Sequence, residues 1–258
     1  MKSYQGYLID LDGTIYRGSQ KIESAVRFVN RLHEKNIPHL FVTNNSSKTP
    51  EAVAEKLQQY GVQATPKQVL TSSLATASYI RKQKQDASVY MIGEDGLKQA
   101  LKDEGLTIAD DVDENTIDYV VIGIDRQITY EKLAKACLAI QKGARFISTN
   151  ADKAIPTERG FVPGNGALTS VIQTATGVNP IFIGKPERMI VELALELLNM
   201  HKDAVIMVGD NYDTDIRSGI NAGIDTLLVF TGVTSKADLK RIPIQPTYTV
   251  DSLDDWSV

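Results

Sequence analysis

Two aspartates, one residue apart, directly follow a short apolar run near the start of the chain. The run 7–9 has the composition of a buried strand, and Asp10, Asp12, Gly13 and Thr14 come next. Asp and Gly are common turn formers, so a plain turn is one interpretation. Two carboxylates this close repel each other unless a cation or a proton lies nearby, so a bound cation is the other.

Three other stretches also place polar groups just after an apolar, strand-like run. They are Thr43, Asn44 and Asn45 after 39–43, Lys185 after 180–184, and Asp210, Asp213 and Asp215 after 204–209. The carboxyl ends of parallel strands lie along one edge of a sheet, and ligands bind outside that edge. We therefore expect these side chains to converge. Asp213 is expected to lie in a solvated loop without a role.

The donor groups of these stretches are oxygens and one lysine, without a histidine cluster. Hard oxygen ligands favour Mg²⁺ over zinc, and Mg²⁺ is commonly held by one or two carboxylates and a phosphate oxygen. Lys185 adds a compact positive charge and Thr43 a neutral donor, which suits a phosphate group. An aspartate beside phosphorus can act as a nucleophile. A second carboxyl two residues on can transfer protons, which is typically worth ~10²–10⁴-fold in rate.

Short apolar runs alternate with amphipathic stretches along most of the chain. Strands are predicted at 6–10, 39–43, 88–93, 118–124, 145–150, 180–184, 204–209 and 226–230. Helices are predicted at 24–35, 49–60, 130–142 and 187–200. This alternation predicts βαβ units, a parallel sheet and an α/β fold.

The stretch 150–166 is the longest one without a periodic pattern. Pro156, Pro163 and the glycines and asparagines at its edges argue against regular structure, and long loops in compact domains are often functional. Residues 164–168, with the sequence GNGAL, leave two interpretations open. They form either the start of a helix, in which the glycines only permit the turn, or part of the functional loop.

The composition excludes several classes of function. The chain has 258 residues, 42% hydrophobic and 23% charged, which suits one large or two small globular domains. Its net charge of −4 offers no basic face for nucleic acid. We expect no membrane partner, since no apolar run approaches the roughly 20 residues that span a bilayer. No signal-peptide apolar region is visible, and the single cysteine, Cys137, is expected to be a structural thiol; both features favour the cytoplasm. A monomer or a homodimer is expected.

The four polar stretches resemble the four motifs of the haloacid dehalogenase (HAD) superfamily. The matching segments are Asp10-x-Asp12-Gly13-Thr14, Thr43-Asn44-Asn45, Gly184-Lys185-Pro186 and Gly209-Asp210-Asn211-x-x-Thr214-Asp215. Their order and spacing cover nearly the whole chain, and the set is similar to the NagD-like, p-nitrophenylphosphatase branch. True dehalogenases of the superfamily lack an acid at the position of Asp12, so its presence points to phosphoryl transfer.

The resemblance implies a role for each of the four aspartates that define the first and last motifs. Asp10 would be the nucleophile, and Asp12 the general acid and base with its backbone carbonyl on the metal. Asp210 would complete the protein ligands of Mg²⁺, and Asp215 would support the metal, through a bound water if not directly.

The resemblance also implies how the phosphoryl group is held. Thr43 and the backbone of Asn44, with Asn45 beside them, would bind the phosphoryl oxygens. Lys185 would neutralise charge during the transfer.

The resemblance further implies two domains, a Rossmann-like catalytic core and an inserted α/β cap. The core would comprise residues 1–70 and 182–258, and the cap residues 71–181. A cap excludes water and contacts the leaving group, so it selects the substrate. The candidate contacts are Asn150, Asp152, Lys153 and Arg159.

A Mg²⁺-dependent phosphomonoesterase is the function that the sequence favours. Its substrates would be small organic phosphates such as sugar or acid-sugar phosphates, nucleoside monophosphates or p-nitrophenyl phosphate. A HAD-type phosphomutase would keep the same motifs, and a phospho-aspartate signalling module would use similar groups, although Asp12 favours turnover over a stored phosphate. The stretch 209–216 resembles a calcium loop but lacks its Gly and terminal Glu.

Overall fold

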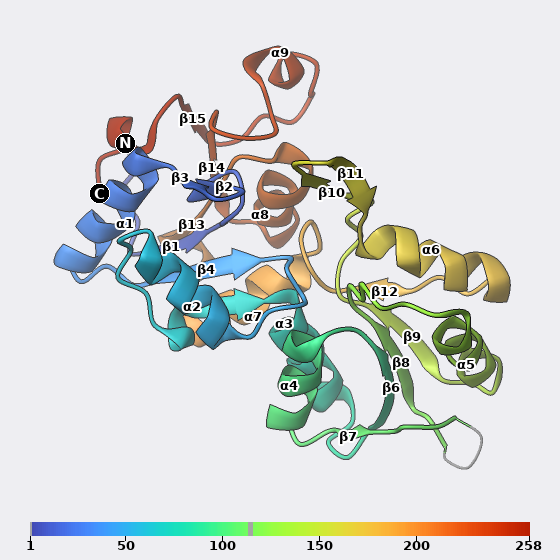
Figure 1. The fold of residues 1–258 in the computed structure, drawn as a ribbon. Helices are drawn as coiled ribbons and strands as arrows, with labels where there is room; N and C mark the ends of the chain where they lie inside the picture. The colour runs from blue at the N-terminus through green and yellow to red at the C-terminus, as the bar shows by residue number, and fades with distance from the viewer. Residues whose placement is uncertain (1, 113–115) are drawn as a thin grey trace. The chain divides into compact units, whose positions relative to one another are not determined.

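The computed structural model describes residues 2–112 and 116–258 (Figure 1). The chain divides into two compact units. Unit 1 comprises Met1–Thr43, Pro50–Leu70 and Lys185–Val258, and unit 2 comprises Asn44–Thr49 and Thr71–Gly184. These ranges differ from the predicted domain boundaries at 44–49 and 182–184, and the assignment of the units as catalytic core and cap stays a prediction.

Unit 1 is built on a six-stranded sheet in which β1 lies between β13 and β4. In sheet order the strands are β15 (Tyr248–Val250), β14 (Asp225–Val229), β13 (Val205–Gly209), β1 (Gly6–Ile9), β4 (His39–Thr43) and β5 (Val69–Thr71). The pairings from β15 to β4 are parallel. Every residue of β1, β4 and β13 is buried, as expected for a parallel sheet covered on both faces.

The helices of unit 1 follow from the apolar spacing of the sequence. They are α1 (Glu23–Glu34), α2 (Pro50–Gln59), α7 (Arg188–Leu198), α8 (Arg217–Ala222) and α9 (Lys236–Leu239). The helix α1 buries Val26, Val29 and Leu32 on the face that joins the core. Pro50 occupies the first position of α2, where its missing N–H is not needed.

Unit 2 contains its own five-stranded parallel sheet. In sheet order the strands are β12 (Ile181–Phe182), β9 (Arg145–Ser148), β8 (Tyr119–Ile122), β6 (Ser88–Ile92) and β7 (Thr107–Ile108). Its helices are α3 (Ser72–Gln83), α4 (Asp95–Asp103), α5 (Tyr130–Gln141) and α6 (Asn165–Thr176). Cys137 of α5 is half-buried against the apolar core of this unit. The predicted α/β class with parallel sheets is therefore confirmed in both units.

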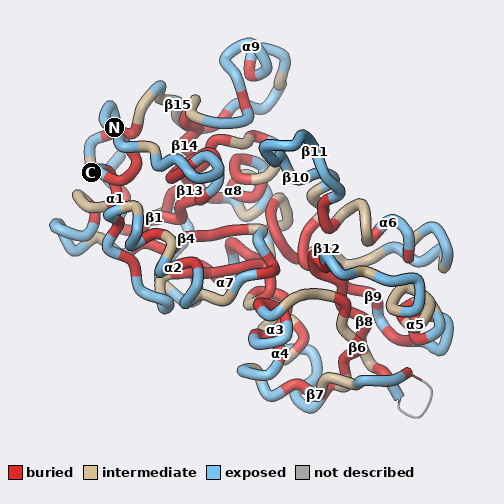
Figure 2. Tube along the Cα trace, viewed as in Figure 1, coloured by how far each residue is buried: buried red, intermediate tan, exposed pale blue. Residues whose placement is uncertain are grey.

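The prediction that 150–166 lacks regular structure was wrong. The chain forms an antiparallel hairpin of β10 (Ala154–Thr157) and β11 (Gly160–Pro163), and α6 begins two residues later. Every residue of the hairpin is exposed or half-buried, in contrast to the buried strands of the sheets (Figure 2). Prolines fit an isolated two-stranded ribbon, because each of its strands keeps an unpaired edge. The helix-start interpretation of 164–168 is confirmed.

Among the helices in the described part of the chain, none is both long enough and apolar enough to span a bilayer.

Candidate active site

The sheet of unit 1 brings the carboxyl ends of three strands together. Ile9 of β1 lies opposite Val208 of β13 and Phe41 of β4, so the residues that follow these strands are neighbours. Asp10 extends the ladder by one bond, because its N–H donates to the carbonyl of Val208 at 2.9 Å. Thr43, the last residue of β4, is buried at the same edge of the sheet.

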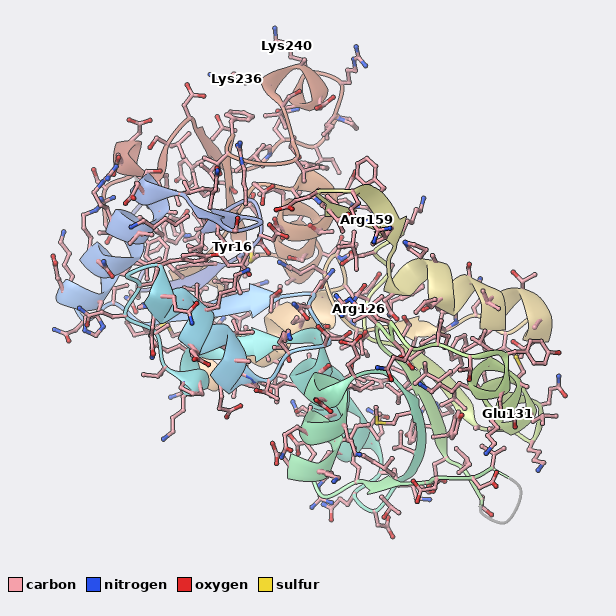
Figure 3. The ribbon with its side chains drawn as sticks, in the orientation of Figure 1. Tyr16, Arg126, Glu131, Arg159, Lys236 and Lys240 are labelled. Carbon is pink, nitrogen blue, oxygen red and sulfur yellow. The ribbon has the colours of Figure 1, made fainter. Side chains whose placement is uncertain are left out.

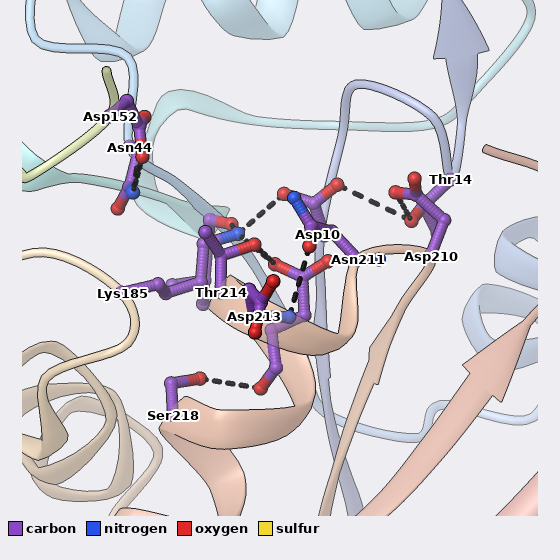
Figure 4. A network of polar contacts seen from close by, with 12 residues as sticks. Asp10, Thr14, Asn44, Asp152, Lys185, Asp210, Asn211, Asp213, Thr214 and Ser218 are labelled. Carbon is purple, nitrogen blue, oxygen red and sulfur yellow. Dashed lines mark hydrogen bonds and ion pairs between the residues drawn. The ribbon is translucent and has the colours of Figure 1, made fainter. Parts of the chain in front are cut away.

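Lys185 lies at the centre of a buried cluster of carboxylates in unit 1 (Figure 4). Its Nζ donates to Asp10 Oδ1 at 2.5 Å and to the carbonyl of Val42 at 2.9 Å. It also pairs with Asp215 Oδ1 at 2.8 Å. An ammonium group has three protons, so it can donate to all three of these oxygens, which together hold it in place.

Thr14 connects the nucleophile candidate to Asp210. Its hydroxyl lies 3.3 Å from Asp10 Oδ2 and 3.1 Å from Asp210 Oδ1, so its single proton can serve either carboxylate. The backbone N–H of Val233 donates to Asp210 Oδ2 at 2.7 Å and fixes the other oxygen. Thr14 belongs to the first motif, but no role was predicted for its side chain. Nothing in the sequence pointed to Val233, because its contribution comes from the backbone.

Two glycines allow the backbone to approach Asp210 closely. A Cβ on Gly13 would lie 2.3 Å from Asp210 Oδ2, and one on Gly232 would lie 1.9 Å from the same atom. Gly13 also has a φ of +94°, which other residues rarely adopt. Both positions therefore require glycine for the cluster to form.

The cluster holds more negative charge than Lys185 can balance. Burial and the neighbouring charge of Asp215 raise the pKa of Asp10 well above its ordinary value, although Lys185 acts in the opposite direction. Burial and Asp215 likewise raise the pKa of Asp210 to about 6. Burial alone would lower the pKa of Lys185, but Asp10 and Asp215 outweigh it and raise that pKa, so the lysine stays charged. A further positive charge would stabilise the ionised aspartates.

The same aspartates fit a hard divalent cation. Asp10, Asp210 and Asp215 each offer a carboxylate oxygen, and these atoms lie within 4.8 Å of one another. Oxygen-only ligands and an excess of negative charge are the features that Mg²⁺ sites share. The residues present therefore fit the predicted metal.

Asp12 does not join the buried cluster. Its side chain is exposed, and its backbone forms an isolated bridge with Tyr16. This bridge leads into a short hairpin of β2 (Tyr16–Arg17) and β3 (Gln20–Lys21). An exposed carboxylate two residues after a buried one is suited to exchange protons with a ligand and with water.

In unit 2, the structure brings Asn44, Asn150 and Asp152 together in a hydrogen-bonded network. Asn44 Nδ2 donates to Asp152 Oδ1 at 3.1 Å. The carbonyl of Asn44 accepts from Asn150 Nδ2 at 2.9 Å and from the hydroxyl of Ser72 at 2.8 Å. Asn44 and Asn150 therefore have structural partners within their own unit.

Asn165 anchors this network and was missed as a site residue. The side chain is 2% exposed, and its Nδ2 lies 3.0 Å from both the carbonyl of Asn150 and Ser148 Oγ. Its Nδ2 also lies 3.3 Å from the carbonyl of Ile122. The sequence signal is the GNG stretch, whose two interpretations, a helix start or part of the functional loop, give Asn165 no role of its own.

The other predicted residues of unit 2 lie apart from this network. Asn45 Oδ1 accepts from the N–H and the hydroxyl of Ser47, both at 2.9 Å, and so stabilises a local turn. Lys153 is exposed just before β10, and Arg159 is exposed at the turn between β10 and β11 (Figure 3).

Two family profiles match most of the chain. The family described as haloacid dehalogenase-like hydrolase matches residues 7–107, and the one described as HAD-hydrolase-like matches residues 182–256.

Two curated relatives match almost over their full length. The 5′-nucleotidase YutF of Bacillus subtilis (strain 168) is 57% identical over 256 residues, which cover 99% of this chain and 98% of the relative. An acid sugar phosphatase of Staphylococcus haemolyticus is 57% identical over 254 residues, which cover 98% of this chain and 95% of the relative.

Solved structures share the fold over the whole chain. A double mutant of thermostable NPPase from Geobacillus stearothermophilus has a TM-score of 0.93 and 54% identity, covering 100% of this chain and 99% of that one. NagD from E. coli K-12 has a TM-score of 0.92 and 32% identity, covering 99% of each chain.

Proposed function

Because the chain belongs to the haloacid dehalogenase-like hydrolase family and is a phosphatase of its NagD-like branch, we propose that it is a Mg²⁺-dependent phosphomonoesterase that forms an aspartyl-phosphate. The observation that supports this most is the buried cluster of Asp10, Lys185, Asp210 and Asp215 at adjacent strand ends. It combines a nucleophile, a fixed cation and ligands for a hard metal.

In the first step, Asp10 attacks the phosphorus and the bond between phosphorus and the leaving oxygen breaks. Asp12 gives its proton to the leaving oxygen, so the alcohol departs neutral. In the second step, Asp12 takes a proton from water, the water attacks the phosphorus, and Asp10 is released. Lys185 holds one oxygen of Asp10 throughout and so fixes the direction in which the other oxygen points.

The metal would be held by the carboxylates of Asp10 and Asp210 and by the backbone carbonyl of Asp12, with Asp215 in support. When bound, Mg²⁺ supplies positive charge to the phosphoryl oxygens and offsets the crowding of the carboxylates. Thr43 would donate its hydroxyl to a phosphoryl oxygen, with the backbone of Asn44 and Asn45 beside it.

We propose small phosphate monoesters as substrates. The two curated relatives are named 5′-nucleotidase and acid sugar phosphatase, and these names support nucleoside monophosphates and sugar or acid-sugar phosphates as the substrates that we propose. Lys153 and Arg159 are the proposed contacts of an acidic leaving group because both are exposed cations. For Asn150 and Asp152 we now propose a different role, which is to hold Asn44, since both already bind it.

The test is phosphate release from p-nitrophenyl phosphate and from a panel of small phosphate monoesters, with Mg²⁺ and after chelation. We expect turnover that depends on Mg²⁺ and is lost in Asp10→Asn. The absence of product from every substrate would overturn the proposal. A stable phosphoprotein without turnover would favour a signalling module, and an isomerised sugar phosphate with little free phosphate would favour a mutase.

A further inference from the structure

The backbone around Asp12 is tied to the β2–β3 hairpin. The N–H of Gly13 donates to the carbonyl of Tyr16 at 2.7 Å, and the N–H of Tyr16 donates to the carbonyl of Leu11 at 3.2 Å. Together with the bridge between Asp12 and Tyr16, these bonds attach Tyr16 to residues on both sides of Asp12. The position of Tyr16 therefore fixes the backbone of Asp12, from which the exposed carboxylate extends.

Lys56 of α2 fixes Tyr16 from outside the hairpin. Its Nζ lies 3.6 Å from the centre of the Tyr16 ring and 5.8 Å from the centre of the Tyr60 ring. The same atom lies 3.5 Å from the carbonyl of Gly18, in the turn between β2 and β3. A cation over an aromatic face is attracted by the ring, and the attraction grows when the cation is partly desolvated.

The environment of Lys56 agrees with such a contact. The side chain is half-buried, and the ring of Tyr16 (labelled in Figure 3) is 9% exposed. Burial lowers the pKa of Lys56, and the negative charge of Asp12 acts in the opposite direction, so the ammonium and this carboxylate are near enough to interact.

We propose that Lys56 is a positioning residue of the reaction: by holding Tyr16 and the hairpin turn, it keeps Asp12 where it can protonate the leaving group. The inference rests on the proposed role of Asp12. If the turn moved, it would carry the carboxylate of Asp12 to many positions, and a fixed backbone removes those from which no proton transfer occurs.

The leaving group of the substrate separates this role from a purely structural one. A sugar alkoxide is a poor leaving group and needs the proton of Asp12, whereas p-nitrophenolate is stable as an anion and needs it little. In Lys56→Met we expect kcat/KM for a sugar phosphate to fall by ~10- to 100-fold, which is within the usual range for acid catalysis. For p-nitrophenyl phosphate we expect a fall of less than ~3-fold, because its first step is nearly independent of the acid.

Four further variants test the contacts themselves. Lys56→Arg keeps a cation over the ring and should restore most of the sugar-phosphate activity. Tyr16→Phe keeps the ring and should resemble the unchanged protein, whereas Tyr16→Leu should reproduce the selective loss. Lys67→Met removes an exposed lysine of the same unit and is the matched control, for which no change is expected.

Equal losses on both substrates in Lys56→Met would overturn the inference, because a general disturbance of the site affects every leaving group. Unchanged kcat/KM on both would overturn it as well. If the unchanged protein releases no phosphate from either substrate, the proposed function itself fails, and this is seen before any variant is compared.

Discussion

Both units place polar side chains at the carboxyl ends of parallel strands, but the two sets differ in charge. In unit 1, three buried carboxylates face the single ammonium of Lys185, and two of them have raised pKa values. In unit 2, the side chains of Asn150 and Asn165 exchange neutral hydrogen bonds with backbone carbonyls and hydroxyls.

This difference in charge indicates that the set in unit 1, rather than the set in unit 2, is suited to bind a ligand. Neutral hydrogen bonds stabilise a fold without calling for a ligand, since most buried polar groups in proteins are paired in this way. An excess of buried negative charge is stabilised only when a cation or protons arrive, so it marks a site that binds something. The sequence prediction relied on polar residues that converge at strand ends. Such convergence occurs in both units, so it does not distinguish a reactive site from a structural network.

The largest expected effect is that of Asp10→Asn. Replacing the nucleophile should lower kcat by at least ~10³-fold, as removal of a nucleophile does in other enzymes. The fold should be retained, because the change removes a buried carboxylate whose ionisation is unfavourable. Turnover of p-nitrophenyl phosphate and the circular dichroism spectrum measure the two effects. Activity within ~10-fold of the unchanged protein would contradict the assignment.

The second prediction concerns metal and pH. In the metal-free protein the pKa of Asp210 is raised to about 6, so the folded state binds this proton more tightly than the unfolded chain. The contribution of Asp210 to stability should therefore be greatest below its ordinary pKa and fall as the pH rises through about 6. Mg²⁺ should raise the Tm more at about pH 7.5 than at about pH 5, since it binds the ionised carboxylates.

Asp210→Asn is the control for this prediction, and its Tm should change less with pH and with Mg²⁺. The same chelation experiment tests activity. Mg²⁺ should restore turnover after chelation, and Ca²⁺ should not, because it accepts looser geometry. An equal response of the Tm to Mg²⁺ in the variant would argue against Asp210 as a ligand.

The third prediction tests the hydrogen-bonded network of unit 2. Asn165→Ala should lower the free energy of unfolding by about 2 kcal/mol, because it removes a buried donor that bonds the carbonyls of Ile122 and Asn150. The kcat of the folded protein should fall by less than ~10-fold, far less than for Asp10→Asn. Ser170→Ala, an exposed change on the same helix, is the matched control and should have little effect. Denaturant unfolding and kinetics measure the two quantities. A fall in the kcat of the folded protein by much more than ~10-fold would remove the distinction between the two sets of polar residues.

The smallest effect is expected from Arg159→Ala. The side chain is exposed on the hairpin, so stability should be unchanged. KM should rise by ~2- to 5-fold for acidic sugar phosphates and less for neutral ones, because an exposed ion pair contributes about 1 kcal/mol or less. Steady-state kinetics on a matched acidic and neutral pair measure this. Equal effects on both substrates would exclude Arg159 as a contact of the acidic group.

Much of unit 1 was predictable from local signals. Buried strands appear in the sequence as apolar runs. The residues that follow them lie close together because the carboxyl ends of parallel strands lie along the same edge of a sheet. The structures of NPPase and NagD confirm the HAD-type α/β fold expected from the motifs. The roles of Asp10, Asp12 and the other site residues stay predictions that the variants above test.

What the sequence did not predict depends on contacts between distant residues. The hairpin after Asn150 is paired only with itself, so its strands carry no apolar alternation. Lys56 has no feature in the sequence that distinguishes it from other lysines on helices, and only the structure places its ammonium over the ring of Tyr16. The bond from Val233 to Asp210 uses a backbone N–H, which no side-chain pattern can indicate.

Unit 2 is encoded in two separate pieces, since Pro50–Leu70 of unit 1 stands between Asn44–Thr49 and Thr71–Gly184. A truncation that removes only 71–184 would leave the six residues Asn44–Thr49 of unit 2 in the chain. It would also remove Ser72 and Asn150, which donate hydrogen bonds to the carbonyl of Asn44. A truncation from 44 to 184 would also delete α2 and with it Lys56. A minimal version of unit 1 therefore has to be engineered with two splice junctions rather than one.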